Sequence, residues 1–346
     1  MNILVTGGAG FIGRWVVKLL LEEPVNRVVA LDDYSNSRPE NLAEFAANRN
    51  LQIVEGDAAD AATLDRVWDE AGPFDVVLHL AARVRVQDSI DAPMPTFRSD
   101  VGGTMAVMER CRRQYFEANG LELDRPFHLT EVEARVVDCR PRVVFMSTCM
   151  VYSRANDRGI DEDHPTRPAS PYGAAKIAAE NMALSYHHAY KLPVKVIRPF
   201  NTYGPFQKRN TEGGVVAIFI ARDLAGEPLL VKGDGAQTRD LLYVEDCARF
   251  VVRAGQTERG DGEVVNAGSG RDIEVRELAK LIADPAGGGH GVAVRHVVHD
   301  HPQAEIPKLL CDSAKAERVY GWKAVVGLEE GIRRTRAWIA ANPGTI

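Results

Sequence analysis

Short apolar runs alternate with longer amphipathic stretches over the first 200 residues of the chain. The apolar runs predict six strands that are buried on both faces, because they contain few polar positions. The stretches between them repeat apolar residues three or four positions apart, which predicts helices. The predicted strands are Asn2–Thr6, Arg27–Leu31, Leu51–Glu55, Val76–Leu80, Arg142–Ser147 and Lys195–Phe200, and the predicted helices are Phe11–Glu22, Ala61–Glu70, Met94–Arg113 and Pro171–Tyr190. This alternation predicts an α/β fold with a Rossmann-type, doubly wound parallel sheet.

The regular alternation ends near residue 200. Residues 201–346 are predicted to form a smaller, mixed α/β C-terminal lobe, from which elements can return to the large domain of residues 1–200. Its predicted helices are Gly213–Ala225, Val244–Ala254, Val275–Asp284, Asp312–Tyr320 and Leu328–Ala341. Within the large domain, the polar stretch at about 113–141 is too long for a loop between a helix and a strand, so we expect an insertion there.

Composition narrows the class of ligand. The net charge of -6 makes a nucleic-acid backbone or an anionic membrane surface a poor partner, so we expect a small molecule. No apolar run approaches the roughly 20 residues of a membrane span, and no leader precedes the first strand, so we expect a cytoplasmic protein. The five cysteines are scattered without a Cys-x-x-Cys pair and are expected to be free thiols.

A glycine-rich turn follows the first predicted strand and opens the first helix, with glycines at positions 7, 10 and 13. Gly7, Gly10 and Gly13 allow a tight turn, a close approach of the backbone to a pyrophosphate, and close packing of helix on sheet. About 20 residues further on, Asp32 follows the second strand, where a carboxylate binds ribose hydroxyls. That carboxylate would repel a 2′-phosphate, so the pattern predicts NAD rather than NADP. Asp57 is placed either to meet the adenine or to cap the next helix.

Tyr172 and Lys176 lie one turn apart at the start of a predicted helix, so their side chains share one face. A free tyrosine ionises near pH 10, but a neighbouring ammonium and a positive nicotinamide ring favour its phenolate. Ser147 and Thr148 end the fifth strand, at the sheet edge where ligands of α/β proteins bind. The pattern predicts Tyr172 as a base, with a hydroxyl group at the same substrate oxygen.

Several specific motifs follow one another along the chain in the order of a known family. They are TGGAGFIG at residues 6–13, Asp57 in EGDAAD, HLAA at 79–82, Tyr172-x-x-x-Lys176, RPFNTYGP at 198–205, and QTRD at 237–240. On these motifs the chain resembles the extended short-chain dehydrogenase/reductase family of nucleotide-sugar epimerases, dehydratases and decarboxylases over almost its whole length. The resemblance implies bound NAD, with Tyr172 as base, Lys176 on the nicotinamide ribose, and Thr148 holding the sugar hydroxyl.

The resemblance also implies the ligand contacts. The implied cofactor residues are Gly7, Gly10, Phe11, Ile12, Gly13, Asp32, Asp33, Asn36, Asp57, Ala58, Leu80, Ala81, Ala82, Tyr172 and Lys176, and the implied substrate residues are Arg83, Thr148, Asn201, Val215, Arg239 and His301. Asn201 and Arg239 would contact the diphosphate of a UDP- or dTDP-linked sugar, for which a guanidinium offers a bidentate fork. Relatives pack the Met94–Arg113 and Pro171–Tyr190 helices into a four-helix bundle, which implies a homodimer.

The residues after Thr148 depart from the family's pattern. Dehydratases of the family carry Asp-Glu there and decarboxylases carry a glutamate, whereas this chain has Cys149-Met150. Methionine cannot take a proton, so the leading prediction is C4 epimerisation through a transient 4-keto sugar. Two alternatives stay open: a dehydratase or decarboxylase-like enzyme with Cys149 as a catalytic acid, and a non-catalytic NAD-binding regulator. Cys149 can also be a small buried residue that packs beside the cofactor.

Three further features bear on chemistry. The family's asparagine before Val-x-Gly-Thr is Asp100 here, and its late Arg-Pro-Gly begins with His301, a titrating group in place of a permanent charge. His79 ends the fourth strand and is expected to be structural. His296, His299 and His301 lack the carboxylate or cysteine partners of a zinc site, so we predict no metal.

Overall fold

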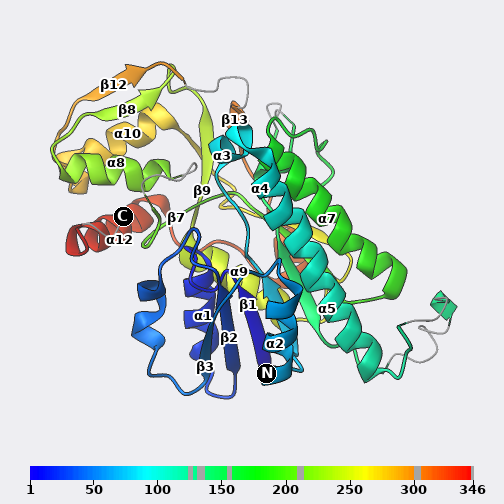
Figure 1. The fold of residues 1–346 in the computed structure, drawn as a ribbon. Coiled ribbons are helices and arrows are strands. Elements are labelled where there is room, and N and C mark those ends of the chain that lie inside the picture. Colours follow the sequence, from blue (N-terminus) through cyan, green and yellow to red (C-terminus); the bar gives the residue numbers. More distant parts are fainter. Residues whose placement is uncertain (124–127, 131–136, 154–157, 209–213, 300–304, 344–346) are drawn as a thin grey trace.

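The computed structural model describes residues 1–123, 128–130, 137–153, 158–208, 214–299 and 305–343. Its centre is a parallel sheet of seven strands in the order β10-β6-β5-β4-β1-β2-β3 (Figure 1). The strands are β1 Asn2–Thr6, β2 Arg27–Asp32, β3 Leu51–Glu55, β4 Val76–His79, β5 Arg142–Met146, β6 Val194–Pro199 and β10 Val264–Ala267. The six predicted strands are all present, with ends that differ by at most one residue. The order reverses between β1 and β4, which confirms the doubly wound α/β fold.

The seventh strand, β10, comes from beyond residue 200 and was not predicted. It pairs in parallel with β6 over Val264–Ala267. Helix α9, Val244–Gln256, precedes it and packs its apolar side on the same sheet. Residues beyond 200 therefore contribute α9 and β10 to the large sheet and its cover, in addition to forming the small lobe.

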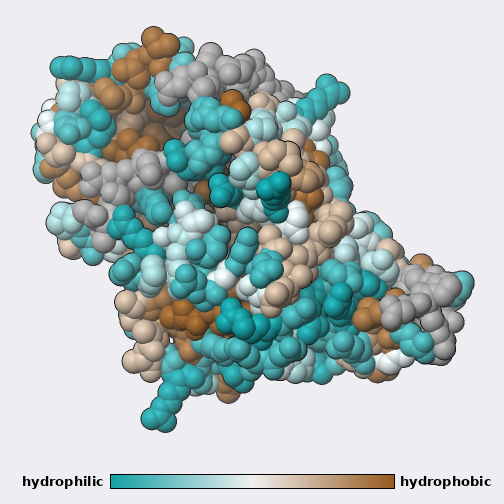
Figure 2. Space-filling view, viewed as in Figure 1, coloured by the Kyte–Doolittle hydropathy of each residue, from teal (hydrophilic) through white to brown (hydrophobic). Residues whose placement is uncertain are grey.

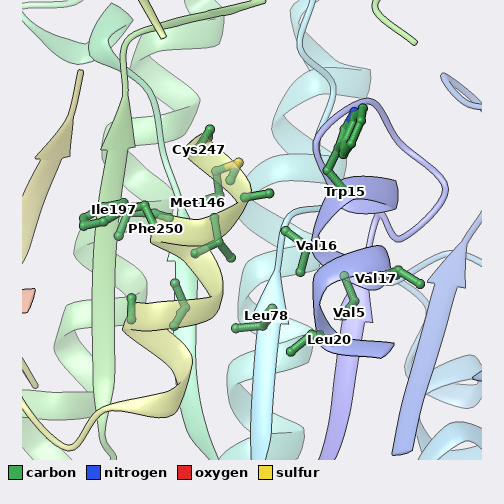
Figure 3. Packing of buried hydrophobic residues seen from close by; sticks show 14 of the residues in the cluster. Val5, Trp15, Val16, Val17, Leu20, Leu78, Met146, Ile197, Cys247 and Phe250 are labelled. Atoms are coloured by element: carbon green, nitrogen blue, oxygen red, sulfur yellow. The ribbon is translucent and has the colours of Figure 1, made fainter. Parts of the chain in front are cut away.

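Successive side chains of a strand point to opposite faces of the sheet, and both faces are apolar here. On one face Val5, Leu78 and Met146 are buried against α9 and α1, which spans Gly13–Leu21 (Figure 3). Each such side chain contributes roughly 1.5–3 kcal/mol of burial. This face anchors the helix that follows the glycine-rich turn.

The opposite face is covered by α2 Ala61–Ala71, α5 Gly103–Ala118 and α7 Pro171–Tyr190. Leu4 and Phe145 belong to this second cluster, one position along their strands from the residues of the first. Helices α5 and α7 run side by side (Figure 1). Helix α7 thus brings its N-terminal turn to the carboxyl edge of the sheet.

The helix predicted over Met94–Arg113 is present, but a π-helical turn divides it. The structure has α4 at Pro93–Phe97, a π-helical turn η2 at Arg98–Gly102, and then α5, all preceded by α3 at Val86–Asp91. A π turn inserts one extra residue into a helix, so the two apolar faces on either side of it are offset by about 100°. The turn holds Asp100 buried, with 1% of its surface exposed.

The predicted insertion at about 113–141 begins later than expected, because α5 continues to Ala118. Asn119 closes its base: Oδ1 accepts the backbone N–H groups of Val137 and Asp138, each at 2.9 Å, and Nδ2 donates to the carbonyl of Asp138 at 2.7 Å. One amide side chain therefore ties the two ends of the insertion together.

The small lobe packs three helices against short strands. Its elements are β7 Asn201–Tyr203, α8 Val215–Leu224, β8 Leu229–Lys232, β9 Thr238–Tyr243, β11 Asp272–Glu274, α10 Val275–Ala283, β12 Val294–Val297, β13 Lys308–Leu309, α11 Ala314–Tyr320 and α12 Leu328–Ala341. Strand β9 pairs with β7, β11 and β13, and β12 pairs with β8. Helix α11 is the exception, since it packs on the large domain's core. The 3-10 turns are η1 Pro39–Phe45, η3 Cys149–Val151 and η4 Pro285–Gly287.

Figure 2 shows hydrophobic residues gathered over the small lobe, near β8 and β12, whereas the face over α2 and α5 is largely hydrophilic. Among the described residues, no helix is both long and apolar enough to cross a membrane.

Candidate active site

The predicted site residues follow the carboxyl ends of neighbouring strands. The glycine-rich turn follows β1, Asp32 ends β2, Thr148 comes just after β5, and Asn201 comes just after β6. In a parallel sheet these ends lie at one edge, and the reversal of strand order between β1 and β4 opens a crevice there. The fold therefore brings the predicted cofactor and catalytic residues to one side of the molecule.

The glycine-rich turn leaves no room for larger residues. Gly7 has φ +70°, and a Cβ on it would lie 2.8 Å from the backbone nitrogen of Ala81. A Cβ on Gly13 would lie 2.0 Å from the carbonyl oxygen of Gly7, and a Cβ on Gly10 would lie 3.0 Å from it. Phe11 and Ile12 lie just before α1, with Ile12 as its N-cap, so the turn leads directly into the helix N-terminus.

Asp32 is buried and fixes the turn from the side of β2. Its Oδ2 accepts the backbone N–H of Ala9 at 2.9 Å, and its Oδ1 accepts the hydroxyl of Ser37 at 2.6 Å. Asn41 of η1 donates from Nδ2 to the carbonyl oxygen of Ala9 at 2.8 Å. Sequence analysis did not predict Asn41, because it lies in a segment without periodicity or motif. The peptide groups of Ala9 are therefore held by side chains before any ligand arrives.

The other predicted adenosine-side residues lie near the ends of β2 and β3. Asp33 is exposed and accepts the backbone N–H of Ser35, and Asn36 lies in the same loop. Asp57 is exposed and accepts the N–H of Ala59 at 2.8 Å, whereas Asp60 caps α2. The capping interpretation of Asp57 is therefore wrong, and its carboxylate stays accessible. Ala58 is buried, and Leu80, Ala81 and Ala82 follow β4 in half-buried positions.

Tyr172 and Lys176 occupy the first turns of α7, as predicted, with exposed fractions of 6% and 3%. The helix begins at Pro171, and Ser170 caps it by accepting the N–H of Gly173 at 3.2 Å. The N–H of Tyr172 donates to Ser89 Oγ at 3.0 Å. Lys176 donates from Nζ to a carbonyl of β5 at 3.1 Å. Burial lowers the pKa of Lys176, and neighbouring carboxylates oppose that shift.

Thr148 caps the short turn η3, accepting the N–H of Met150 at 3.2 Å. Cys149 is buried in an apolar cluster with Phe200 and Cys311. Burial raises the pKa of Cys149 to about 12, with Arg239 opposing the shift. The thiol is therefore neutral, contrary to the lowered pKa that would have made it a strong acid.

His79 links β1, β4 and α5 through neutral hydrogen bonds. Its Nδ1 lies 2.7 Å from Thr6 Oγ1, and its Nε2 lies 3.2 Å from Thr104 Oγ1. Thr104 donates its only hydroxyl proton to the carbonyl of Asp100 at 2.6 Å, so Nε2 is the donor nitrogen and Nδ1 accepts from Thr6. Burial lowers the pKa of His79 to about 3. His79 is a structural residue, as expected.

The substrate side contains one pair that sequence analysis missed. Arg239 donates from Nη1 to the carbonyls of Thr238 at 2.7 Å and Ile306 at 3.1 Å, and its Nη2 forms an ion pair with Glu305. Glu305 also bonds to His299, with Oε2 and Nε2 2.6 Å apart. No motif marked this glutamate, since its contact spans 66 positions of the chain.

The remaining predicted substrate residues are less closely grouped. Val215 begins α8, and Arg83 follows β4, its backbone N–H donating to Asp100 Oδ1 at 2.8 Å. His301 lies outside the described residues. His296 bonds through Nδ1 to a backbone carbonyl, and in the described part of the chain no three His, Cys, Asp or Glu side chains gather as metal ligands would.

The site fits a dinucleotide and a polar substrate. The turn of Gly7–Gly13 packs too closely on the protein's own backbone to hold a Cβ at Gly7 or Gly13, and it leads into the N-terminus of α1, where a pyrophosphate is typically bound. Two buried polar atoms around the same edge lack a hydrogen-bond partner among the described residues: Ser147 Oγ and Asn201 Oδ1. Buried polar atoms are rarely left so in a native protein, so these groups are consistent with a ligand that completes them.

Comparisons with known proteins agree with this geometry. Residues 3–268 match the family described as the NAD dependent epimerase/dehydratase family. The chain is similar to the UDP-glucose 4-epimerase of Mycolicibacterium smegmatis, with 35% identity over 97% of each protein. It is similar to the dTDP-glucose 4,6-dehydratase of Neisseria gonorrhoeae, with 33% identity over 99% of this chain and 96% of that protein.

Among solved structures, Pal from Bacillus thuringiensis is 49% identical, covers 99% of both chains and superposes with a TM-score of 0.87. The relatives and the solved structure match nearly the whole chain, and the fold agrees with them. The chain belongs to the NAD dependent epimerase/dehydratase family, an NAD-dependent group within the extended short-chain dehydrogenases/reductases.

Proposed function

We propose that this protein is an NAD-dependent epimerase that inverts C4 of a nucleotide-linked sugar through a transient 4-keto sugar. One observation carries the choice within the family. Tyr172 and Lys176 lie buried together on α7, while the two positions after Thr148 are Cys149 and Met150, which hold no carboxylate to serve as an elimination base.

Each catalytic residue has a separate task. Tyr172 in its phenolate form removes the proton of the C4 hydroxyl and becomes a neutral phenol, Lys176 stabilises the phenolate before this step by its charge, and Thr148 bonds to the same sugar oxygen. Bound NAD would supply an acceptor for the C4 hydride and its return to the other face of the sugar ring. The reaction then has no net redox change, so one tightly held cofactor serves many turnovers.

The substrate is bound across the two parts of the chain. We assign NAD to residues 1–200 together with β10, and the sugar nucleotide mainly to residues 201–346. Arg239 and Asn201 are the diphosphate contacts, since a guanidinium binds phosphate oxygens bidentately. UDP and dTDP are the nucleotides to test, because the relatives named above act on UDP-glucose and dTDP-glucose.

We also propose a homodimer formed through α5 and α7, in a cytoplasmic protein. Large apolar side chains on this side of the molecule support the dimer: Met94, Phe97 and Met105 have exposed fractions of 56%, 50% and 52%. Exposed apolar residues that cluster on helices are typical of protein interfaces.

The test is turnover of candidate sugars followed by NMR. We expect UDP-glucose, UDP-N-acetylglucosamine or dTDP-glucose to be converted into a mixture with its C4 epimer. Tyr172→Phe should reduce the rate at least about a hundredfold, because it removes the acid–base group. Tyr190→Phe, at the other end of α7, is the matched control and should retain activity. An unsaturated or 4-keto product would contradict epimerisation.

A dehydratase reaction is the second candidate, and the dehydratase relatives support keeping it. Cys149 is the residue after Thr148 that carries a proton, but burial raises its pKa to about 12, which makes the thiol a weak acid. If the protein is a dehydratase, Cys149→Ala should reduce turnover by at least about tenfold. If it is an epimerase, the same variant should retain its turnover. A non-catalytic regulator would tolerate Tyr172→Phe without any change.

A further inference from the structure

Lys176 carries its ammonium in an almost fully buried position, next to one carboxylate. Its Nζ donates to the carbonyl oxygen of Met146 at 3.1 Å, and Asp100 Oδ2 lies 3.9 Å away. The side chains are 4% and 0% exposed, respectively. Asp100 Oδ2 has no hydrogen-bond partner among the described residues. Burial raises the pKa of Asp100, and the Lys176 ammonium is the main group that opposes this shift.

The fold holds Asp100 firmly. Its Oδ1 accepts the backbone N–H of Arg83, and its carbonyl oxygen accepts the hydroxyl of Thr104, which in turn accepts from His79. Asp100 lies within the π turn η2, and π turns inside α-helices frequently occur at functional sites. These two hydrogen bonds to Asp100 fix the residue, and its second carboxylate oxygen lies 3.9 Å from Lys176 Nζ.

The other ionisable groups around Lys176 do not supply an equivalent charge. Glu180, one turn further along α7, is bound in a bidentate pair to Arg198 at 2.9 and 2.6 Å. His79 of β4 is neutral, since burial lowers its pKa to about 3. Burial lowers the pKa of Lys176, and Asp100 is the main group that opposes this shift.

We propose that Asp100 is a positioning residue of the reaction centre, whose buried carboxylate is the counter-charge that keeps Lys176 protonated. The inference rests on the proposed function only in that Lys176 acts on NAD. An asparagine at position 100 could still accept the N–H of Arg83, but it would carry no charge. The carboxylate therefore has a function that the amide of similar shape cannot perform.

Asp100→Asn tests the charge with little change of shape. Without the charge of Asp100, the Lys176 ammonium loses its proton at a lower pH. NAD binding should therefore weaken as the pH rises. We expect NAD affinity within about threefold of wild type at pH 6.5 and at least about tenfold weaker at pH 8.5. The wild-type affinity should change less than about threefold over the same range. An equal loss at both pH values, or no loss, would overturn the proposal.

A second pair of variants separates positioning from folding. In a Lys176→Met background, Asp100→Asn should add no pH-dependent loss, because the group it acts through is absent. A persistent pH-dependent effect, or a Lys176→Met protein with unchanged NAD affinity, would contradict the inference. Asp91→Asn, which removes an exposed carboxylate of α3, is the control and should behave as wild type. NAD affinity needs no sugar, so failure to turn over any nucleotide sugar would count against the proposed reaction alone.

Discussion

Gly13 begins α1 in direct contact with the turn that precedes it, because a Cβ on Gly13 would lie 2.0 Å from the carbonyl oxygen of Gly7. The obstacle is backbone, which cannot rotate away as a side chain can. The closeness that brings the helix N-terminus to a pyrophosphate therefore depends on the absence of one methyl group.

Gly13→Ala should accordingly disrupt the cofactor site. We expect a loss of roughly 1–3 kcal/mol in the free energy of unfolding and at least about tenfold weaker NAD binding. Gly102→Ala is the matched control, since a Cβ there would meet nothing within 4 Å. Its unfolding free energy should be unchanged or slightly higher. Calorimetry with and without NAD measures both effects, and an alanine at 13 that binds NAD normally would refute this account of the turn.

His79 should make stability depend on pH. Its pKa is about 3 in the folded protein and near 6.5 when unfolded, so the unfolded chain takes up a proton first as the pH falls. The contribution of neutral His79 to the free energy of unfolding is complete above pH 6.5. It is lost as the pH falls toward 3, at about 1.4 kcal/mol per pH unit. Between pH 7 and pH 5, the free energy of unfolding of His79→Asn should therefore fall by about 2 kcal/mol less than that of wild type. The exposed His188→Gln should retain the wild-type slope in urea titrations; identical slopes for all three proteins would contradict the assignment.

Thiol labelling should distinguish one cysteine from the other four. Cys139 is exposed, whereas Cys111, Cys149, Cys247 and Cys311 are buried. The thiolate is the reactive form, and burial raises the pKa of Cys149 to about 12. An aromatic disulfide reagent at pH 8 should react with one thiol of the native protein and with five after unfolding. Cys139→Ser should abolish the native reaction; rapid labelling of Cys149 would show that the thiol is accessible and ionised.

The buried pair of Arg198 and Glu180 should be costly to break. Glu180→Gln leaves the guanidinium without its partner charge, so we expect a loss of roughly 3–5 kcal/mol in the free energy of unfolding. Glu330→Gln, in the exposed pair with Arg333, is the control and should change stability by less than about 1 kcal/mol. Urea unfolding measures both, and equal effects would mean that burial does not matter at this pair.

The parts of the site that sequence analysis predicted correctly are local. The glycine-rich turn, the start of α7 and the strand ends each depend on residues close in sequence, so a short pattern specifies them. Asp32 is a partial case: its position after β2 was predicted, but its bond to Ala9 spans 23 positions and was not.

The missed features depend on contacts between distant segments. β10 has only two β-branched residues before Asn266, too short an apolar run to signal a strand, and it is a strand because it pairs with β6. Asn41 and Glu305 are polar residues in irregular segments, and only the folded chain brings them to Ala9 and Arg239. The roles of the site residues toward NAD and sugar remain predictions, because they concern ligands and not the chain alone.

The most direct test of the account follows the hydrogen at C4. A UDP-sugar carrying deuterium at C4 should yield its C4 epimer with the deuterium still at C4 and no hydrogen taken from solvent, because the same atom is removed and returned. Tyr172→Phe should stop the conversion into the C4 epimer. Product NMR showing deuterium moved to another carbon, or solvent hydrogen in the sugar, would contradict C4 epimerisation by Tyr172.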